Sequence, residues 1–278
     1  QMQGLEVAAK ADVMMGTLME KAGLSVADHA IQHLGSPRGA RVLVLVGAGN
    51  NGADGLVTAR HLRRWGAQAS IYLATHRPTP DPKMELALEH GVAVFSSAKD
   101  PELVELDSNL QGCRLVLDAM LGTGRTRPFE GLVKEIAQRI NAWHSTGMNR
   151  VQDHQIFALD LPSGLDSDTG QTDPNSFAAD QTLALGFPKV GLLTFPGAGL
   201  VGQLRVLDIG LPPDLEPEQG IDLELLSPNW VGSHLPVRPL DSHKGTFGHA
   251  LIVAGSRSYV GAAFLAAQAA VRSGAGLV

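Results

Sequence analysis

The most constraining feature of this sequence is a run of five consecutive apolar residues, 42–46 (VLVLV), that ends directly at Gly47. A strand buried on both faces has such a continuous run, whereas a half-buried strand alternates apolar and polar residues. Residues 54–65 follow with an amphipathic helical pattern, and residues 69–74 form a second apolar run. The order strand, helix, strand predicts a parallel βαβ unit covered by helices.

The same alternation continues along the chain. A covering helix is predicted within the first 34 residues, where apolar side chains recur at helical spacing. The polar stretch 145–154 has no periodicity and is predicted to be a surface loop. We therefore expect an α/β fold, a Rossmann-like, mostly parallel sheet with helices on both faces. The remaining elements are strands at residues 92–95, 114–118, 156–160, 182–185 and 204–209, and helices at 83–90 and 130–143.

Two proline-punctuated stretches, residues 212–217 and 228–239, predict a linker between domains. Beyond it, a strand is predicted at 249–254 and an alanine-rich helix at 261–273. One strand and one helix cannot enclose a core by themselves. We therefore expect one domain over residues 1–226 and, over residues 227–278, a linker with the first βα portion of a truncated second domain. The alternative is a terminal unit docked on the first sheet.

Composition limits the classes of function. Twenty-two Lys and Arg against 28 Asp and Glu give a net charge of −6, which disfavours nucleic acid as a partner. With 44% hydrophobic and 18% charged residues, the chain is not globally disordered. No apolar run is long enough to span a bilayer. The single cysteine, Cys113, excludes an internal disulfide and favours a reducing compartment, so we expect a cytoplasmic protein without a membrane partner.

Residues 47–52 (GAGNNG) match the pattern GxGxxG between a buried strand and a helix, the context in which that pattern has a mechanical role. Glycines there permit a tight turn and close approach of a ligand, and free amides at the helix start favour an anion such as pyrophosphate. A dinucleotide-binding dehydrogenase would place an acid at the end of the second strand. Residues 70–76 (SIYLATH) contain none, which disfavours a hydride-transfer enzyme and equally a methyltransferase.

Oxygen-bearing side chains follow three of the predicted strands. Asn50, Asn51 and Asp54 follow the first of them, Asp118 ends another, and Asp160 ends a third. Because open α/β sheets bind ligands at the carboxyl ends of their strands, we expect these groups to converge on one site. Amide and carboxylate oxygens can hold a ligand or a hard cation. The alternative is local turn chemistry for the first three residues and the capping of a turn for Asp118.

Five motifs in this order closely resemble the N-terminal, YjeF-type domain of NAD(P)H-hydrate epimerases, over residues 1 to about 210. Ala53 departs from the family pattern, which usually has glycine at that position. Residues 242–278 resemble the opening of the ADP-dependent NAD(P)H-hydrate dehydratase, a ribokinase-like domain fused behind the epimerase in many bacterial proteins. The motifs are LMEKAG at residues 18–23, NNGAD at 50–54, DAMLGTG at 118–124, DLPSGLDSDTG at 160–170 and GFPKVGLL at 186–193.

The resemblance implies a bifunctional nicotinamide nucleotide repair enzyme. Its substrate would be hydrated NADH or NADPH (NADHX or NADPHX), whose R and S forms this domain would interconvert at C6 of the nicotinamide ring. The dehydratase would need ADP, and we expect no dehydratase activity from this chain because the later glycine-rich segments of that domain are absent from it. We also expect a homo-oligomer. The alternative function is a non-catalytic nucleotide-binding scaffold or sensing module.

The resemblance also implies roles for individual residues. Asp160 would be the catalytic acid–base group, and Asn51, Asp118 and Ser163 would hold a potassium ion through oxygen atoms. Lys189 would either contact the substrate as an auxiliary residue or be a solvated lysine. The substrate-binding set would comprise Asn50, Asn51, Gly52, Ala53, Asp54, Gly122, Thr123, Gly124, Arg125, Thr126, Arg127, Pro128 and Asp160.

A metal site built on histidine is disfavoured by the same sequence. His29 and His33 form an i, i+4 pair, but no third ligand accompanies them. We expect both to be surface residues.

Overall fold

The structure is a computed structural model that describes residues 15–124, 128–147, 154–211 and 223–278. The chain divides into two compact units, residues 1–221 and 222–278. No helix within the described ranges is long and apolar enough to cross a membrane.

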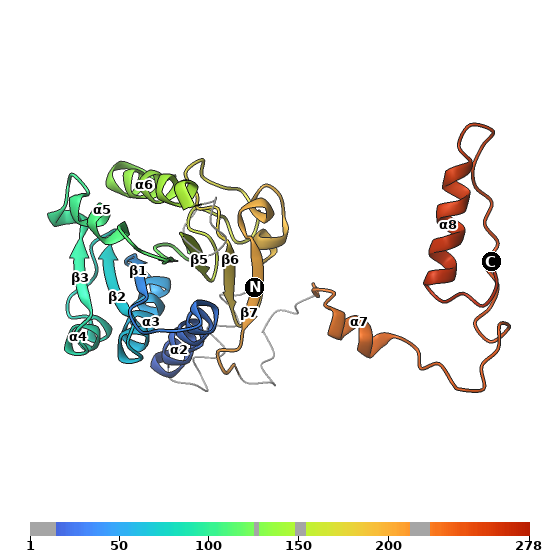
Figure 1. Cartoon of the computed structure of the whole chain (residues 1–278), viewed down its shortest axis with the longest axis horizontal. Helices are drawn as coiled ribbons and strands as arrows, with labels where there is room; N and C mark the ends of the chain where they lie inside the picture. Colours follow the sequence, from blue (N-terminus) through green and yellow to red (C-terminus); the bar gives the residue numbers. More distant parts are fainter. Residues whose placement is uncertain (1–14, 125–127, 148–153, 212–222) are drawn as a thin grey trace. The chain divides into compact units, whose positions relative to one another are not determined.

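The first unit contains a seven-stranded sheet with the order β3-β2-β1-β4-β5-β6-β7, and each neighbouring pair of strands is parallel (Figure 1). The strand order reverses between β1 and β4, which lie side by side at the centre. This arrangement confirms the predicted Rossmann-like α/β fold. The strands are β1 (Arg41–Val46), β2 (Gln68–Leu73), β3 (Ala93–Ser96), β4 (Leu115–Ala119), β5 (Gln155–Leu159), β6 (Gln181–Leu185) and β7 (Gln203–Leu207).

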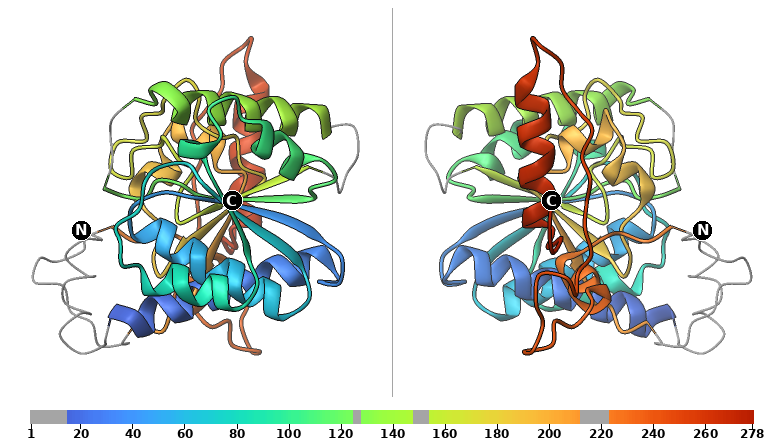
Figure 2. Two further views of the ribbon diagram at one scale, coloured as in Figure 1. Left: turned by 90° about the vertical axis from the view of Figure 1, so that its left-hand side faces the viewer. Right: turned by 90° about the vertical axis from the view of Figure 1, so that its right-hand side faces the viewer.

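Helices cover both faces of this sheet, as Figure 2 shows from its two ends. Helices α2, α3 and α4 lie on one face, and α5 and α6 lie on the other. In the described part of this unit, three short 3-10 helices (η1 to η3) lie in the connections. The helices are α2 (Met15–Leu34), α3 (Asn50–Arg64), α4 (Pro82–Glu89), α5 (Val104–Leu110), α6 (Gly131–Gly147), η1 (Ser97–Lys99), η2 (Val190–Leu193) and η3 (Gly197–Leu200).

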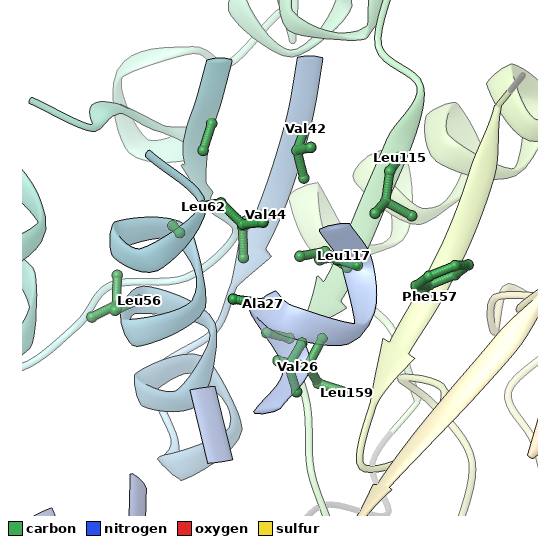
Figure 3. Packing of buried hydrophobic residues seen from close by; sticks show 14 of the residues in the cluster. Val26, Ala27, Val42, Val44, Leu56, Leu62, Leu115, Leu117, Phe157 and Leu159 are labelled. Atoms are coloured by element: carbon green, nitrogen blue, oxygen red, sulfur yellow. The ribbon is translucent and has the colours of Figure 1, made fainter. Parts of the chain in front are cut away.

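One half of the core lies between the sheet and helices α2 and α3. Val44 of β1 and Leu117 of β4 are buried there with Val26 of α2 and with Leu56 and Leu62 of α3 (Figure 3). Successive side chains of a strand point to opposite faces. The even-numbered residues of β1 therefore serve this half of the core.

The other half of the core lies under α5 and α6. Leu43 and Leu45 of β1 pack there with Leu106 of α5 and with Ile136 and Ile140 of α6. Both faces of β1 are thus covered, which explains why its sequence is a continuous apolar run rather than an alternating one.

Several element boundaries differ from the sequence predictions. Helix α3 begins at Asn50 rather than at residue 54, so the NNGAD motif forms the first turns of a helix and not a loop. Helix α6 continues through Gly147, into the stretch predicted to be a loop, because its hydrogen-bonded turns extend beyond the apolar stripe. Residues 148–153 of that stretch, and residues 1–14 at the start, lie outside the described residues. The short helix α5 was not predicted.

Within residues 223–278, the second unit contains two helices, α7 (Pro228–His234) and α8 (Val260–Arg272). The predicted alanine-rich helix is confirmed by α8, whereas α7 lies in the stretch predicted to be linker. Helix α7 forms because Ser227 Oγ accepts a hydrogen bond of 3.1 Å from the Trp230 amide, with Pro228 at the first helical position.

The predicted strand at residues 249–254 is wrong. Only an isolated bridge between His249 and Leu277 is present there. Leu251 and Val253 are 90% and 91% exposed. A strand forms only where a neighbouring backbone pairs with it, and the described part of this unit offers such a partner at one position. The assignment of residues 227–278 to a dehydratase fragment stays a prediction.

The central position of β4 predicts a large effect of shortening its side chains. Leu117 is fully buried in the core. The variant Leu117→Ala should lower the free energy of unfolding by about 2–5 kcal/mol, because a cavity remains where the side chain was removed. Urea denaturation measures this difference. Leu88→Ala on α4, where the side chain is 53% exposed, is the control and should cost about 0.5 kcal/mol or less; equal losses in the two variants would contradict the burial of Leu117.

Candidate functional site

A cavity of about 710 Å³ lies along the carboxyl-terminal edge of the sheet. Its lining includes residues at the ends of five adjacent strands, which are β2, β1, β4, β5 and β6 in sheet order. This edge, next to the point where the strand order reverses, is where open α/β sheets bind ligands. The lining residues of the strand ends are Ala48, Gly49, Asn50, Asn51, Asp54, Thr75, His76, Met120, Leu121, Gly122, Thr123, Gly124, Asp160 and Leu185.

The cavity brings together seven of the residues predicted to bind substrate. Gly52 and Ala53 are buried in α3 instead, and Pro128 is exposed; none of these three is among the described lining residues. The remaining predicted residues, Arg125, Thr126 and Arg127, lie outside the described residues. The seven lining residues are Asn50, Asn51, Asp54, Gly122, Thr123, Gly124 and Asp160.

The first part of the site is the turn from β1 into α3. A Cβ atom on Gly47 would lie 1.7 Å from the Met120 carbonyl oxygen, and one on Gly52 would lie 2.0 Å from the Gly47 carbonyl oxygen. Glycine is therefore required at both positions by close backbone packing. Ala53, which replaces the usual family glycine, is 6% exposed, so its methyl group is accommodated within the packed helix.

Arg77 supports this turn from the end of β2. Its Nη1 donates to the carbonyl oxygens of Gly47 and, at 3.3 Å, of Gly49, and its Nε donates to Asp81 Oδ2 at 2.7 Å. The sequence analysis did not assign a role to Arg77. The sequence feature that could have indicated a role is the position of Arg77 just after the second strand, where a dehydrogenase would have an acid and this chain has none.

The second part of the site is the fully buried carboxylate of Asp118. Ser163 Oγ donates to its Oδ1 at 2.6 Å and the Ser163 amide donates to its Oδ2 at 2.7 Å. The Met120 amide also donates to Oδ1, at 3.2 Å. Burial raises the pKa of Asp118 to about 6, while these hydrogen bonds act in the opposite direction. None of the hydrogen bonds described for this carboxylate comes from a cationic side chain.

Asn51 joins the same cluster through the backbone of Leu121. Its Nδ2 donates to the Leu121 carbonyl oxygen at 2.7 Å, and the Leu121 amide donates to Ser163 Oγ at 2.9 Å. Its Oδ1 is buried and has no hydrogen-bond partner among the described residues. A buried amide oxygen without a donor is uncommon in folded proteins, and it can bind a cation instead. The chemistry of Asn51, Asp118 and Ser163 therefore fits a hard cation such as potassium.

The third part of the site is Asp160, directly after β5. Its backbone has φ +65°, in the left-handed region that Asp and Asn tolerate better than most residues. Its Oδ1 accepts a hydrogen bond from the Leu185 amide at 3.1 Å and another from Lys189 Nζ. Lys189 is 5% exposed and is not among the described lining residues of the cavity. The solvated alternative for Lys189 is therefore wrong, since the lysine lies behind Asp160.

The cavity also has an apolar wall that the sequence analysis did not assign. Helix α2 lies so close to α3 that a Cβ on Gly23 would be 2.5 Å from Val57 Cβ. This helix carries the LMEKAG motif, which was the only sequence feature that could have indicated that the helix lines the site. The wall consists of Leu18, Met19 and Ala22 of α2 together with Ile209 and Leu211 after β7.

His29 and His33 lie away from the cavity. His29 Nε2 lies 2.7 Å from Gln181 Oε1, and the His33 ring contacts Phe157 edge-on. His33 is exposed, as predicted, and His29 is half-buried. Among the residues that the structure describes, no group of three His, Cys, Asp or Glu side chains could hold a metal ion.

Comparison with known proteins identifies the family of this chain. Residues 15–191 match the family described as YjeF-related protein N-terminus. The chain belongs to this family. The YjeF-type match begins in α2 and ends in η2, so it includes the turn after β1, Asp118, Asp160 and Lys189.

Curated relatives extend the similarity beyond the YjeF-type segment. The bifunctional NAD(P)H-hydrate repair enzyme Nnr of Moorella thermoacetica is 38% identical over 266 residues, which cover 94% of this chain and 48% of that protein. The enzyme of the same name from Thermofilum pendens is 38% identical over 277 residues, covering 98% and 49%. The chain thus spans about half the length of the curated relatives it matches.

A solved structure of similar fold is that of the yeast protein YNL200c. Its TM-score is 0.54 at 24% sequence identity, and the match covers 72% of this chain and 80% of that chain. This similarity supports the fold of the first unit.

The close packing of the turn after β1 predicts different effects for two of its glycines. Gly52→Ala should lower the free energy of unfolding by about 1–3 kcal/mol, because the new methyl group meets a backbone oxygen. Gly49→Ala is the matched control, since no atom lies within 4 Å of its Cβ position, and it should cost less than about 1 kcal/mol. Chemical denaturation of both variants measures the difference, and an equal or reversed order would contradict the packing.

Proposed function

We propose that the first unit interconverts the R and S forms of hydrated NADH or NADPH at C6 of the nicotinamide ring. The observation that carries the proposal is one cavity in which Asp160 shares its lining with the glycine turn after β1. Two further facts support it. The family match includes both elements, and the curated relatives are named NAD(P)H-hydrate repair enzymes.

The dimensions of the cavity suit a dinucleotide. Neighbouring strands are about 4.8 Å apart, so five adjacent strands span roughly 19 Å. The volume of 710 Å³ lies within the range of about 300–1,000 Å³ typical of ligand pockets. The amides at the start of α3 suit the pyrophosphate. The nicotinamide ring would then lie near Asp160, between Leu185 and the apolar wall.

The chemistry needs one group that both gives and takes a proton. The ring nitrogen forms a double bond to C6 as the C6–O bond breaks, and the protonated Asp160 carboxyl gives its proton to the leaving oxygen, which departs as water. Water then adds to the opposite face of C6 and releases its proton to solvent, from which the Asp160 carboxylate takes up a proton. The bond to nitrogen returns to a single bond and Asp160 regains its initial state. Such positioned proton transfer contributes about 10²–10⁴-fold in rate.

In this proposal potassium would bind in the epimerase site, whereas ADP would not. A bound potassium ion would be held by Asn51, Asp118 and Ser163, and it would supply positive charge to the buried carboxylate. These residues would fix the turns after β1, β4 and β5 around the substrate. ADP would serve only the dehydratase of a full-length protein. The homo-oligomer and the cytoplasmic location stay predictions from the sequence.

A non-catalytic nucleotide-binding module is the alternative. Such a module has no need for an ionisable group on the cavity wall, whereas Asp160 is one of the lining residues. Thermal-shift comparison of NADHX, NAD and S-adenosylmethionine tests ligand choice, because a ligand that binds the folded state raises the unfolding temperature. Stabilisation by NADHX without turnover would favour the module.

The central test of the proposal is Asp160→Asn. Asparagine tolerates the left-handed backbone, so the variant should fold, but it cannot exchange the proton. We expect the rate of R–S interconversion, followed by chromatography of the separated epimers, to fall by about 10²–10⁴-fold. The control is Asp168→Asn, an exposed carboxylate in the same motif, which should keep the rate. An undiminished rate in Asp160→Asn would refute the assignment.

A second test concerns the potassium ion. Potassium chloride should raise the unfolding temperature above that in tetramethylammonium chloride of equal ionic strength. At 100 times its Kd the ion would add about 2.7 kcal/mol to the free energy of unfolding. Ser163→Ala should lose the difference between the two salts, and Ser167→Ala in the same motif should retain it. Identical unfolding temperatures of the unmodified protein in both salts would argue against the ion.

A further inference from the structure

Lys189 is a buried lysine whose ammonium group lies directly behind the proposed catalytic carboxylate. Its side chain is 3% exposed, and its Nζ donates to Asp160 Oδ1 and, at 3.2 Å, to the Leu185 carbonyl oxygen. A buried charge is costly unless it is paired. The pairing partner here is itself part of the cavity wall.

The two oxygens of Asp160 have different surroundings. Oδ1 accepts from two donors, the Leu185 amide and Lys189 Nζ. No hydrogen bond to Oδ2 is described, and Oδ2 is not among the buried side-chain atoms that lack a partner. Because Asp160 lines the cavity, Oδ2 is the oxygen available to a bound ligand.

The backbone fixes the direction of this carboxylate as well. The left-handed conformation of Asp160 follows the last residue of β5, and its amide donates to the Leu183 carbonyl oxygen of β6 at 2.9 Å. Lys189 follows β6 by four residues, just before η2. The ends of two neighbouring strands thus hold the two partners of the ion pair.

We infer that Lys189 is a positioning residue for Asp160, an inference that rests on the proposed function. Lys189 holds Oδ1, so that Oδ2 exchanges the proton with the substrate oxygen. Lys189 itself does not touch the substrate.

The test is Lys189→Met in the 278-residue chain, assayed for R–S interconversion of NADHX. Misplacement of a catalytic group by about 1 Å costs up to about 100-fold in rate, so kcat should fall by about 10- to 100-fold. KM should change by less than roughly threefold, because the substrate contacts remain. The control is Ile140→Ala in α6, a fully buried side chain that is not among the described lining residues of the cavity; it should lower stability but keep kcat.

A double-variant cycle separates positioning from general stabilisation. Residues that act as one unit have non-additive effects. Asp160→Asn combined with Lys189→Met should therefore be no slower than Asp160→Asn alone. Multiplicative losses, or an unchanged kcat in Lys189→Met, would overturn the inference. An unmodified chain without epimerase activity would instead refute the proposed function, so the two failures are distinguishable.

Chemical rescue covers the case in which Lys189→Met does not fold. Lys189→Ala is prepared and assayed with ethylammonium chloride or with tetramethylammonium chloride at equal ionic strength. Ethylammonium can donate a hydrogen bond to Oδ1 and tetramethylammonium cannot, so only the first salt should restore turnover. Equal turnover in the two salts would contradict the positioning role.

Discussion

The site depends on the buried carboxylate of Asp118 and the two hydrogen bonds that it accepts from Ser163. These bonds tie the end of β4 to the turn after β5, and Leu121 extends the connection to Asn51 at the start of α3. Three segments that are distant in sequence thereby share one polar cluster beneath the cavity. The apolar sheet brings the strand ends together, but this cluster determines the positions of the turns that follow them.

Much of the fold could be predicted because the strands β1, β4, β5 and β6 are buried on both faces and are therefore recognisable as continuous apolar runs. The start of α3 could not. Asn50, Asn51 and Gly52 are weak helix formers, yet they are helical. Gly52 packs closely against the Gly47 carbonyl oxygen, and the Asn51 side chain donates to the Leu121 carbonyl oxygen. The run at 249–254 was misassigned for the opposite reason: its composition favours a strand, but strand formation requires a paired backbone.

The parts of the candidate site that lie directly at the ends of strands could be predicted from the sequence. Parallel strands place Asp118 and Asp160 at the same edge whatever their exact contacts. The burial of Lys189 and the hydrogen bonds of Arg77 could not be predicted in this way. They depend on how a connecting segment returns to the sheet, which no periodicity in the sequence encodes.

The close approach of α2 to α3 at Gly23 has a consequence for the kind of molecule that the cavity admits. Leu18, Met19 and Ala22 of the apolar wall belong to α2, and this helix can approach α3 so closely only because Gly23 has no side chain. Adding a single methyl group at Gly23 would force the two helices apart and move the wall relative to the strand ends. The distance between α2 and α3 thus determines how much room the cavity leaves for a ring between the wall and the strand ends.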